Sequence, residues 1–466
     1  MVTINLDKIF HPKTIAIIGA SNEEGSVGQI LMKNLTMNGF EGKVVPVNIR
    51  RKEVMGKKAY QSVSEIPESI DLAIIATPAN TVPSIVEECG KAGIKGLIII
   101  SAGFREIGQE GLALEKQLIA LKNKYNLRII GPNCFGIIRP SLNLNATFGE
   151  MLPKAGNIAF ISQSGALGSA ILDWALGQNL GFSNFVSVGS MIDVDFGDLI
   201  DYFGSDPQTR SIILYIEGIS DARKFMSAAR HFAKTKPIVV VKAGKFSESA
   251  QAAASHTGSL TGSDLVYDAA FKRAGIVRVE EISDLFNAAE VLGMQPLPLG
   301  PRLAIITNAG GPGVMAADAL LNRGGKLARL SEKTVNSLNR ILPPYWSHGN
   351  PIDVLGDADA NRYREVMDLC LADDKVDGIL IIYTPQAIAA AEEIALSVIG
   401  MCDARGGCQK TILTSFMGGE QVDEANRIFT ESGYPTYWTP EQSVKTYMYM
   451  YQYKRNLELL YETPEE

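Results

Sequence analysis

The chain has 466 residues, of which 46% are hydrophobic, and a formal net charge of -7 at pH 7. This length suits roughly three domains, and the acidic balance argues against a nucleic acid partner, because proteins that bind the phosphate backbone carry a basic face. No apolar run reaches the roughly 18 residues that span a bilayer, and residues 1–10 lack a signal-peptide pattern, so we expect a cytoplasmic protein without a membrane partner.

Residues 14–20, TIAIIGA, form an apolar run that predicts a strand buried on both faces. Ser21, Gly25 and Gly28 follow it and precede an amphipathic stretch, which is the strand, glycine loop and helix of a dinucleotide-type fold. The glycine spacing is looser than the usual three-glycine fingerprint, but amides at a helix N-terminus still suit a phosphate. The next strand, residues 43–48, ends at Asn48 and not at an acidic residue, which disfavours NAD.

Three more apolar runs, residues 71–78, 96–104 and 127–136, continue this alternation. Polar and small residues end each run, and the carboxyl ends of parallel strands meet at one edge of a sheet, where ligands bind in such folds. The sequence therefore predicts a ligand cleft at this edge. The residues expected there are Thr77, Pro78, Ser101, Gly103, Asn133 and Cys134.

A second α/β unit follows a connection at residues 140–156. Residues 157–176 read as a buried strand, a turn and a helix, but the turn does not fit the G-x-S-x-G nucleophile elbow, because Gln163 stands two residues before Gly165. We interpret the turn as an anion cradle built from backbone amides. Further strands are expected at residues 183–189, 211–219 and 237–245. Glu217 ends the second of these, where a buried carboxylate needs a partner, and a histidine would serve.

Residues 251–264, QAAASHTGSLTGSD, place His256 among small and hydroxyl residues. Such neighbours do not hold an imidazole in a core and suit a mobile segment that presents it. The pattern indicates a nucleophile on a loop. A loop histidine without any chemical role is the alternative.

A third unit follows the proline-rich residues 296–301. Residues 302–326 repeat the design of the second unit, with Asn308, Gly310, Gly311 and Gly313 in the turn. Strands are expected at 377–385 and 409–419, and residues 444–466 read as a packed helix with an acidic tail. The five cysteines predict neither a disulfide framework nor a metal site, and the spacing of Cys402 and Cys408 is too weak a signal for zinc.

Four motifs follow the CoA-type domain: the ISQSGALG turn, the YIEGI strand, the SHTGSLTG loop and the TNAGGPGV turn. In this combination the sequence resembles the α subunit of ADP-forming acetyl-CoA synthetase, of the succinyl-CoA synthetase-like superfamily. The resemblance covers residues 5–455. It implies an α/β fold of three consecutive domains: a Rossmann-like CoA-binding domain at 1–145 and two flavodoxin-like, succinyl-CoA synthetase-like domains at 146–297 and 298–466.

The resemblance also implies site residues. His256 would be phosphorylated, with Glu217 steadying the phosphohistidine and no metal at that point. Two helix N-termini would receive the phosphate, at Ser162, Gln163, Ser164 and Gly165, and at Gly310, Gly311, Gly313 and Val314. The residues expected to bind CoA are Gly19, Ser21, Gly25, Ser26, Val27, Gly28, Val47, Asn48, Thr77, Pro78, Ser101, Gly103, Phe104 and Asn133.

The sequence contains no G-x-x-x-x-G-K-S/T loop and no ATP-grasp-like stretch. We therefore expect ADP or ATP and Mg on a separate ATP-grasp β subunit, in an α2β2 complex that converts acetyl-CoA, ADP and phosphate to acetate, ATP and CoA. Three alternatives stay open: a ligase for succinate or another acid, a CoA-binding regulatory or acyltransferase module without phosphoryl transfer, and an NAD-type oxidoreductase. Succinate would require a cationic contact for its second carboxylate.

Overall fold

A computed structural model describes residues 4–177, 180–246, 249, 263–387 and 389–461. The chain divides into two compact units, Met1–Glu281 and Ile282–Glu466, each with its own sheets and hydrophobic clusters. Among the described residues, no helix combines the length and the apolar character that a bilayer crossing requires.

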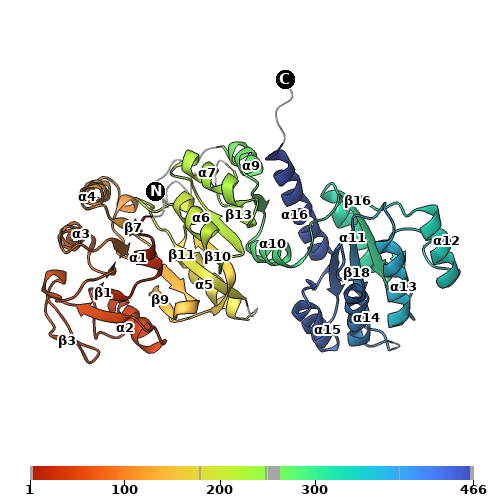
Figure 1. Ribbon diagram of the computed structural model, residues 1–466, viewed down its shortest axis with the longest axis horizontal. Coiled ribbons are helices and arrows are strands. Elements are labelled where there is room, and N and C mark those ends of the chain that lie inside the picture. Colours follow the sequence, from red (N-terminus) through yellow and green to blue (C-terminus); the bar gives the residue numbers. More distant parts are fainter. Residues whose placement is uncertain (1–3, 178–179, 247–248, 250–262, 388, 462–466) are drawn as a thin grey trace, which may run out of the picture. The chain divides into compact units, whose positions relative to one another are not determined.

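The first sheet of unit 1 is parallel, with the strand order β2-β1-β5-β6-β7. Figure 1 labels β1 and β7 of this sheet and the helices α1 to α4 of the same part of the chain. Apart from Thr14, which begins β1, the residues of the sheet's inner strands are apolar or glycine and are buried, since helices cover such sheets on both faces. The strands are β1 (Thr14–Ile18), β2 (Lys43–Val47), β5 (Leu72–Ile75), β6 (Gly96–Ile99) and β7 (Arg128–Ile130), with a small ribbon of β3 (Glu53–Val54) and β4 (Lys57–Lys58). The helices are α1 (Asp7–Phe10), α2 (Val27–Met37), α3 (Val82–Lys91) and α4 (Gln109–Tyr125).

The second sheet of unit 1 has the order β14-β13-β12-β10-β11-β8-β9. Its strands are β8 (Gly136–Arg139), β9 (Leu144–Thr147), β10 (Lys154–Ser162), β11 (Gly181–Ser187), β12 (Ser211–Ile216), β13 (Ile238–Lys242) and β14 (Val277–Val279). Its helices are α5 (Gly165–Gly177), α6 (Phe196–Ser205), α7 (Ala222–Phe232) and α9 (Asp264–Arg273). Helix α6 begins at a capping box: the Asp195 carboxylate accepts a hydrogen bond from the backbone amide of Asp198, and the Asp198 carboxylate accepts one from the backbone amide of Asp195.

The antiparallel hairpin of β8 and β9 corrects two sequence predictions. Residue 136 was expected to end a strand, whereas Gly136 begins β8, and residues 140–156 were expected to form a connection, whereas they contain β9 and the start of β10. Both hairpin strands are buried throughout, so they lack the polar alternation by which a hairpin is recognised in a sequence. The turn passes through Asn143 in the left-handed conformation.

Unit 2 contains one parallel sheet with the order β16-β15-β18-β19, and β17 also pairs with β15. Its strands are β15 (Arg302–Thr307), β16 (Lys326–Leu327), β17 (Ile352–Asp353), β18 (Gly378–Tyr383) and β19 (Thr411–Phe416). Its helices are α10 (Ile282–Met294), α11 (Gly310–Asn322), α12 (Glu332–Ile341), α13 (Ala360–Leu371), α14 (Ala391–Ala404), α15 (Glu420–Glu431) and α16 (Pro440–Leu459). The expected C-terminal helix is confirmed, since α16 buries Tyr447 and Met450 in the core.

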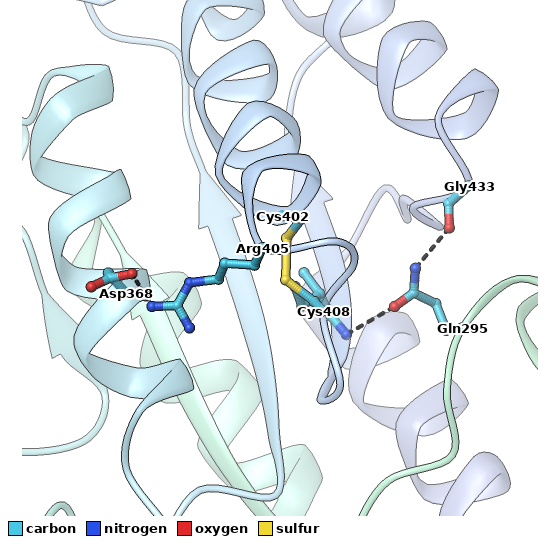
Figure 2. The surroundings of a disulfide bond; sticks show 7 residues. Gln295, Asp368, Cys402, Arg405, Cys408 and Gly433 are labelled. Atoms are coloured by element: carbon cyan, nitrogen blue, oxygen red, sulfur yellow. Dashed lines mark hydrogen bonds and ion pairs between the residues drawn. A yellow bond between two sulfur atoms is a disulfide. The ribbon is translucent and has the colours of Figure 1, made fainter.

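A disulfide joins Cys402, in the last turn of α14, to Cys408, ahead of β19 (Figure 2). This finding corrects, for one pair, the expectation that the cysteines form no disulfide framework. The chain reverses between them through Gly406 and Gly407, both with positive φ, and this turn brings the two Cα atoms to 5.2 Å, within the range of a disulfide. The six-residue separation of Cys402 and Cys408 does not by itself predict a disulfide, because the two cysteines meet only when the chain turns at the glycines between them. Nearby, Arg405 pairs with Asp368 and Gln295 accepts a hydrogen bond from the amide of Ile412.

Candidate active site

A cavity of about 790 Å³ opens in unit 1 at the carboxyl ends of strands from both of its sheets. It brings together residues that were predicted separately for CoA, for phosphate and for the stabilising carboxylate. The predicted residues that line it are Val27, Thr77, Ser101, Asn133, Cys134, Gln163, Ser164, Gly165 and Glu217. The predicted meeting of strand ends therefore occurs in the fold.

The first-sheet side of the cavity is held by Ser101. Its hydroxyl donates to the carbonyl of Thr77 at 2.5 Å and accepts from the amide of Thr77 at 3.2 Å, so it joins the ends of β5 and β6. Asn133 adopts a left-handed conformation after β7 and is exposed. Cys134 beside it is buried, and burial raises the pKa of its thiol to about 12, which keeps the sulfur protonated.

The second-sheet side is the turn from β10 into α5. The buried Ser162 hydroxyl donates a hydrogen bond to the carbonyl of Ser164 at 2.7 Å and accepts one from the amide of Ser164 at 3.1 Å. The hydroxyl of Ser164 accepts a hydrogen bond from the amide of Leu167. Helix geometry leaves the first-turn amides of Gly165 and Ala166 without carbonyl partners in the helix. These two residues line the cavity, so the turn presents the positive end of α5 to it.

Glu217 follows β12, lines the cavity and is only 7% exposed. Gln163 fixes its backbone, because Gln163 Oε1 accepts from the amides of Glu217 at 2.8 Å and Gly218 at 3.0 Å. Burial, and secondly the charge of Glu217, raises the pKa of Tyr215. The side chain of Gln163, predicted to contact phosphate, thus acts first as a tie between the ends of β10 and β12.

Unit 2 repeats this arrangement at the turn from β15 into α11. The Thr307 hydroxyl donates to the carbonyl of Ala309 at 2.7 Å and accepts its amide at 3.0 Å. Asn308 Oδ1 accepts the amide of Thr384, the first residue after β18, at 2.9 Å. The internal likeness expected from the sequence therefore extends to individual hydrogen bonds. The predicted phosphate residues Gly310, Gly311, Gly313 and Val314 form the first turn of this α11.

The remaining predicted CoA residues are not among those that line the cavity. In the first turn of α2, a Cβ on Gly28 would lie 1.9 Å from the carbonyl oxygen of Gly19, so only glycine allows α2 to approach the end of β1 so closely. Ser26 caps α2, and Asn48 donates to the carbonyl of Ala20. Gly19, Ser21 and Gly25 lie on the loop between β1 and α2, Val47, Pro78 and Gly103 lie at or after strand ends, and the Phe104 side chain is in the core. His256 lies outside the described residues.

Several cavity residues were missed by the sequence reading. Phe135, Phe148, Ser190 and Met191 lie in loops and Arg105 begins a short 3-10 helix, all without a motif, so only the tertiary fold brings them to the cavity. Lys242, which is not among the residues that line the cavity, was also missed; it ends the apolar β13 beside the end of β12. It is 1% exposed, its pKa is lowered by burial, and its ammonium group lies 4.6 Å from the centre of the Tyr267 ring. A lysine at the end of an apolar strand could have been noticed in the sequence.

Comparison with known proteins places this geometry in a family. Residues 13–140 match a CoA binding domain, residues 155–292 a succinyl-CoA ligase like flavodoxin domain, and residues 303–461 a Ligase-CoA domain. The chain is 42% identical to the α subunit of ADP-forming acetate–CoA ligase I of Pyrococcus furiosus, over 97% of this chain and 98% of that subunit. The chain belongs to the ADP-forming acetate–CoA ligase family.

Two further family members agree. ADP-forming acetate–CoA ligase I of Archaeoglobus fulgidus is 42% identical over 97% of this chain, which spans 64% of that protein. The solved dinucleotide-forming acetyl-coenzyme A synthetase 1 of Ca. Korarchaeum cryptofilum, in complex with phosphate and ADP, superposes with a TM-score of 0.89 at 36% identity, covering 98% of each chain. The predicted family, the α/β fold with its CoA-binding and succinyl-CoA ligase-like domains, and the ligase class are confirmed.

Proposed function

We propose that this chain acts as the α subunit that converts acetyl-CoA and phosphate to acetyl phosphate and CoA, and then carries the phosphoryl group on His256 to ADP. A phosphate oxygen attacks the thioester carbonyl carbon, the carbon–sulfur bond breaks, and the CoA thiolate leaves and takes up a proton. A ring nitrogen of His256 next attacks phosphorus and acetate leaves. An oxygen of the ADP β-phosphate then accepts the phosphoryl group, which forms ATP and frees His256.

One observation supports this proposal most: a single cavity contains strand ends predicted for CoA, the N-terminal turn of α5 and the carboxylate of Glu217. The amides of α5 are suited to a phosphate dianion, and each helix end contributes about 0.3 to 2 kcal/mol to anion binding. A carboxylate that accepts the second ring N–H of a histidine fixes its tautomer and stabilises the positive charge of the phosphorylated ring. We assign that role to Glu217 and a second phosphate site to the first turn of α11.

The finer features of the assembly belong to the same proposal. The chain would pair with an ATP-grasp β subunit that holds ADP and Mg, in an α2β2 complex in the cytoplasm. The His256 segment would move between the acyl-CoA site and the ADP–Mg site of the β subunit. The three domains would be residues 1–145, 146–297 and 298–466. The absence of a nucleotide phosphate loop from the sequence supports the need for a partner.

The test is transfer of ³²P from labelled phosphate in the presence of acetyl-CoA. We expect acid-labile, base-stable label on the wild-type chain and none on His256→Asn. The matched control is His348→Asn, because His348 is an exposed histidine of unit 2 whose ring bonds to Asn339 and Pro344; it should still be labelled. Label on His256→Asn would contradict the proposal, and CoA binding without any label would favour the regulatory module.

A further inference from the structure

We propose that Phe148, backed by Phe135, forms the wall that holds the acyl group and restricts the substrates to short acids with an uncharged, apolar chain. This inference rests on the proposed function and extends it to substrate class. Phe148 lines the cavity and is 37% exposed, whereas Phe135 is 4% exposed. The two rings meet edge to face, with centroids 4.7 Å apart and planes at 70°.

The aromatic pair lies beside the amides expected to hold phosphate. A Cβ on Gly165, the first residue of α5, would lie 3.2 Å from the Cβ of Phe135. In the proposed reaction a phosphate oxygen bonds to the acyl carbon, so the acyl group must lie next to the phosphate site. The aromatic pair supplies a large apolar surface that can contact it there.

Phe148 is also held firmly in place. The buried Asn34 amide group donates to the carbonyls of Thr147 at 2.9 Å and Gly149 at 2.7 Å. The buried Asn145 amide group donates to the carbonyl of Gly149 at 3.2 Å. The loop on both sides of Phe148 is therefore fastened to two buried side chains. A ring supported in this way limits the size of a ligand, since it cannot readily move aside.

The charged side chains of the cavity determine whether the acyl chain of the substrate can carry a charge. Among the described residues that line it, the one cationic side chain is Arg105, and its guanidinium binds the Glu115 carboxylate through Nε at 2.9 Å and a terminal nitrogen at 2.8 Å. Glu106 and Glu217 add carboxylates to the lining. A second carboxylate on the acyl chain would thus meet an apolar wall and like charges, which is unfavourable.

The experiment measures kcat/KM of the chain with its partner subunit for acetate, butyrate, hexanoate and succinate. We expect Phe148→Ala to raise the hexanoate-to-acetate ratio by roughly tenfold or more, because each methylene admitted to an apolar pocket changes kcat/KM by about 10-fold to 200-fold. Phe148→Trp should lower the same ratio. Trp174→Ala is the matched control, since Trp174 is 38% exposed on α5 but does not line the cavity, and its ratio should equal that of the wild type.

Each outcome decides the matter. An unchanged ratio in both Phe148 variants overturns the inference, as does succinate used as well as acetate by the wild type. If Phe148→Ala does not fold, as judged by its thermal midpoint, Phe148→Trp still gives the test. A wild-type complex that forms no acyl-CoA from any acid would refute the proposed function instead, so the two failures are distinguishable.

Discussion

Gln163 shows how one side chain can position a residue of the site without reacting. Its Oε1 accepts two backbone amides, those of Glu217 and Gly218. The sequence placed Gln163 in an anion-binding turn, and the structure adds that its carbonyl oxygen is engaged by the chain itself. This hydrogen bond between a side chain and a distant backbone amide cannot be predicted from residue spacing, because Gln163 and Glu217 are 54 residues apart.

Replacing Gln163 by Met keeps the length of the side chain and removes the acceptor. We expect a loss of about 1 to 3 kcal/mol in the free energy of unfolding, because partly buried amides lose their partner. Phosphohistidine formation should slow as well, since Glu217 is no longer fixed. Chemical denaturation and the labelling assay measure the two effects.

The control is Gln295→Met in unit 2, where the side chain also accepts a backbone amide, that of Ile412. It should lower stability but leave labelling intact. Equal labelling rates in Gln163→Met and the wild type would contradict the positioning role.

The two strand-to-helix turns are the elements on which the proposed chemistry depends. Ser162 and Thr307 are fully buried, and each hydroxyl binds the amide and the carbonyl of the residue two positions later. The sequence predicted both turns from an apolar run followed by small residues, because a buried parallel strand and a glycine-bearing helix start are local patterns. It did not predict the hairpin of β8 and β9, because both of its faces are covered by tertiary contacts.

Ser162→Ala and Thr307→Val remove these hydroxyls with little change of shape. Each should lower the free energy of unfolding by about 1 to 3 kcal/mol, as expected for buried polar groups that lose a partner. Ser162→Ala should also weaken the binding of phosphate, measured by calorimetry on the purified chain, because the first turn of α5 loses its anchor. Phosphate affinity equal to the wild type, together with a lower stability, would limit Ser162 to a structural role.

At the scale of the whole molecule, the two units are stabilised by separate interactions. Asp377 in unit 2 is 2% exposed. Its carboxylate accepts hydrogen bonds from the backbone amide of Arg302 at 2.9 Å and from the Arg302 guanidinium at 2.8 and 2.6 Å. Burial by itself raises the pKa of Asp377, but the bonds from Arg302 outweigh it and the pKa is lowered from 3.8. A lowered pKa means that the folded state binds the proton less readily than the unfolded state.

Asp377→Asn should therefore destabilise unit 2 near neutral pH, by about 1.5 to 3 kcal/mol for hydrogen bonds to a charged group. The difference from the wild type should be fully present above pH 3.8, the ordinary pKa, and should disappear as the pH falls through the lowered pKa of Asp377. Denaturation followed at several pH values measures this. A difference that grows toward acid would contradict the assignment, and a second transition, from unit 1, should be unaffected.

The sequence by itself determined the parallel α/β units, both strand-to-helix turns, the family and the candidate residues His256 and Glu217. These features are local or carried by motifs, since apolar runs, glycines and turn residues act over a few positions. The tertiary structure alone decided that two sheets share one cavity, that Gln163 ties Glu217 in place, that Phe148 packs on Phe135 beside the α5 turn, and that Cys402 pairs with Cys408. These features depend on contacts between segments far apart in the chain or on the geometry of a turn, and neither is encoded in spacing or composition.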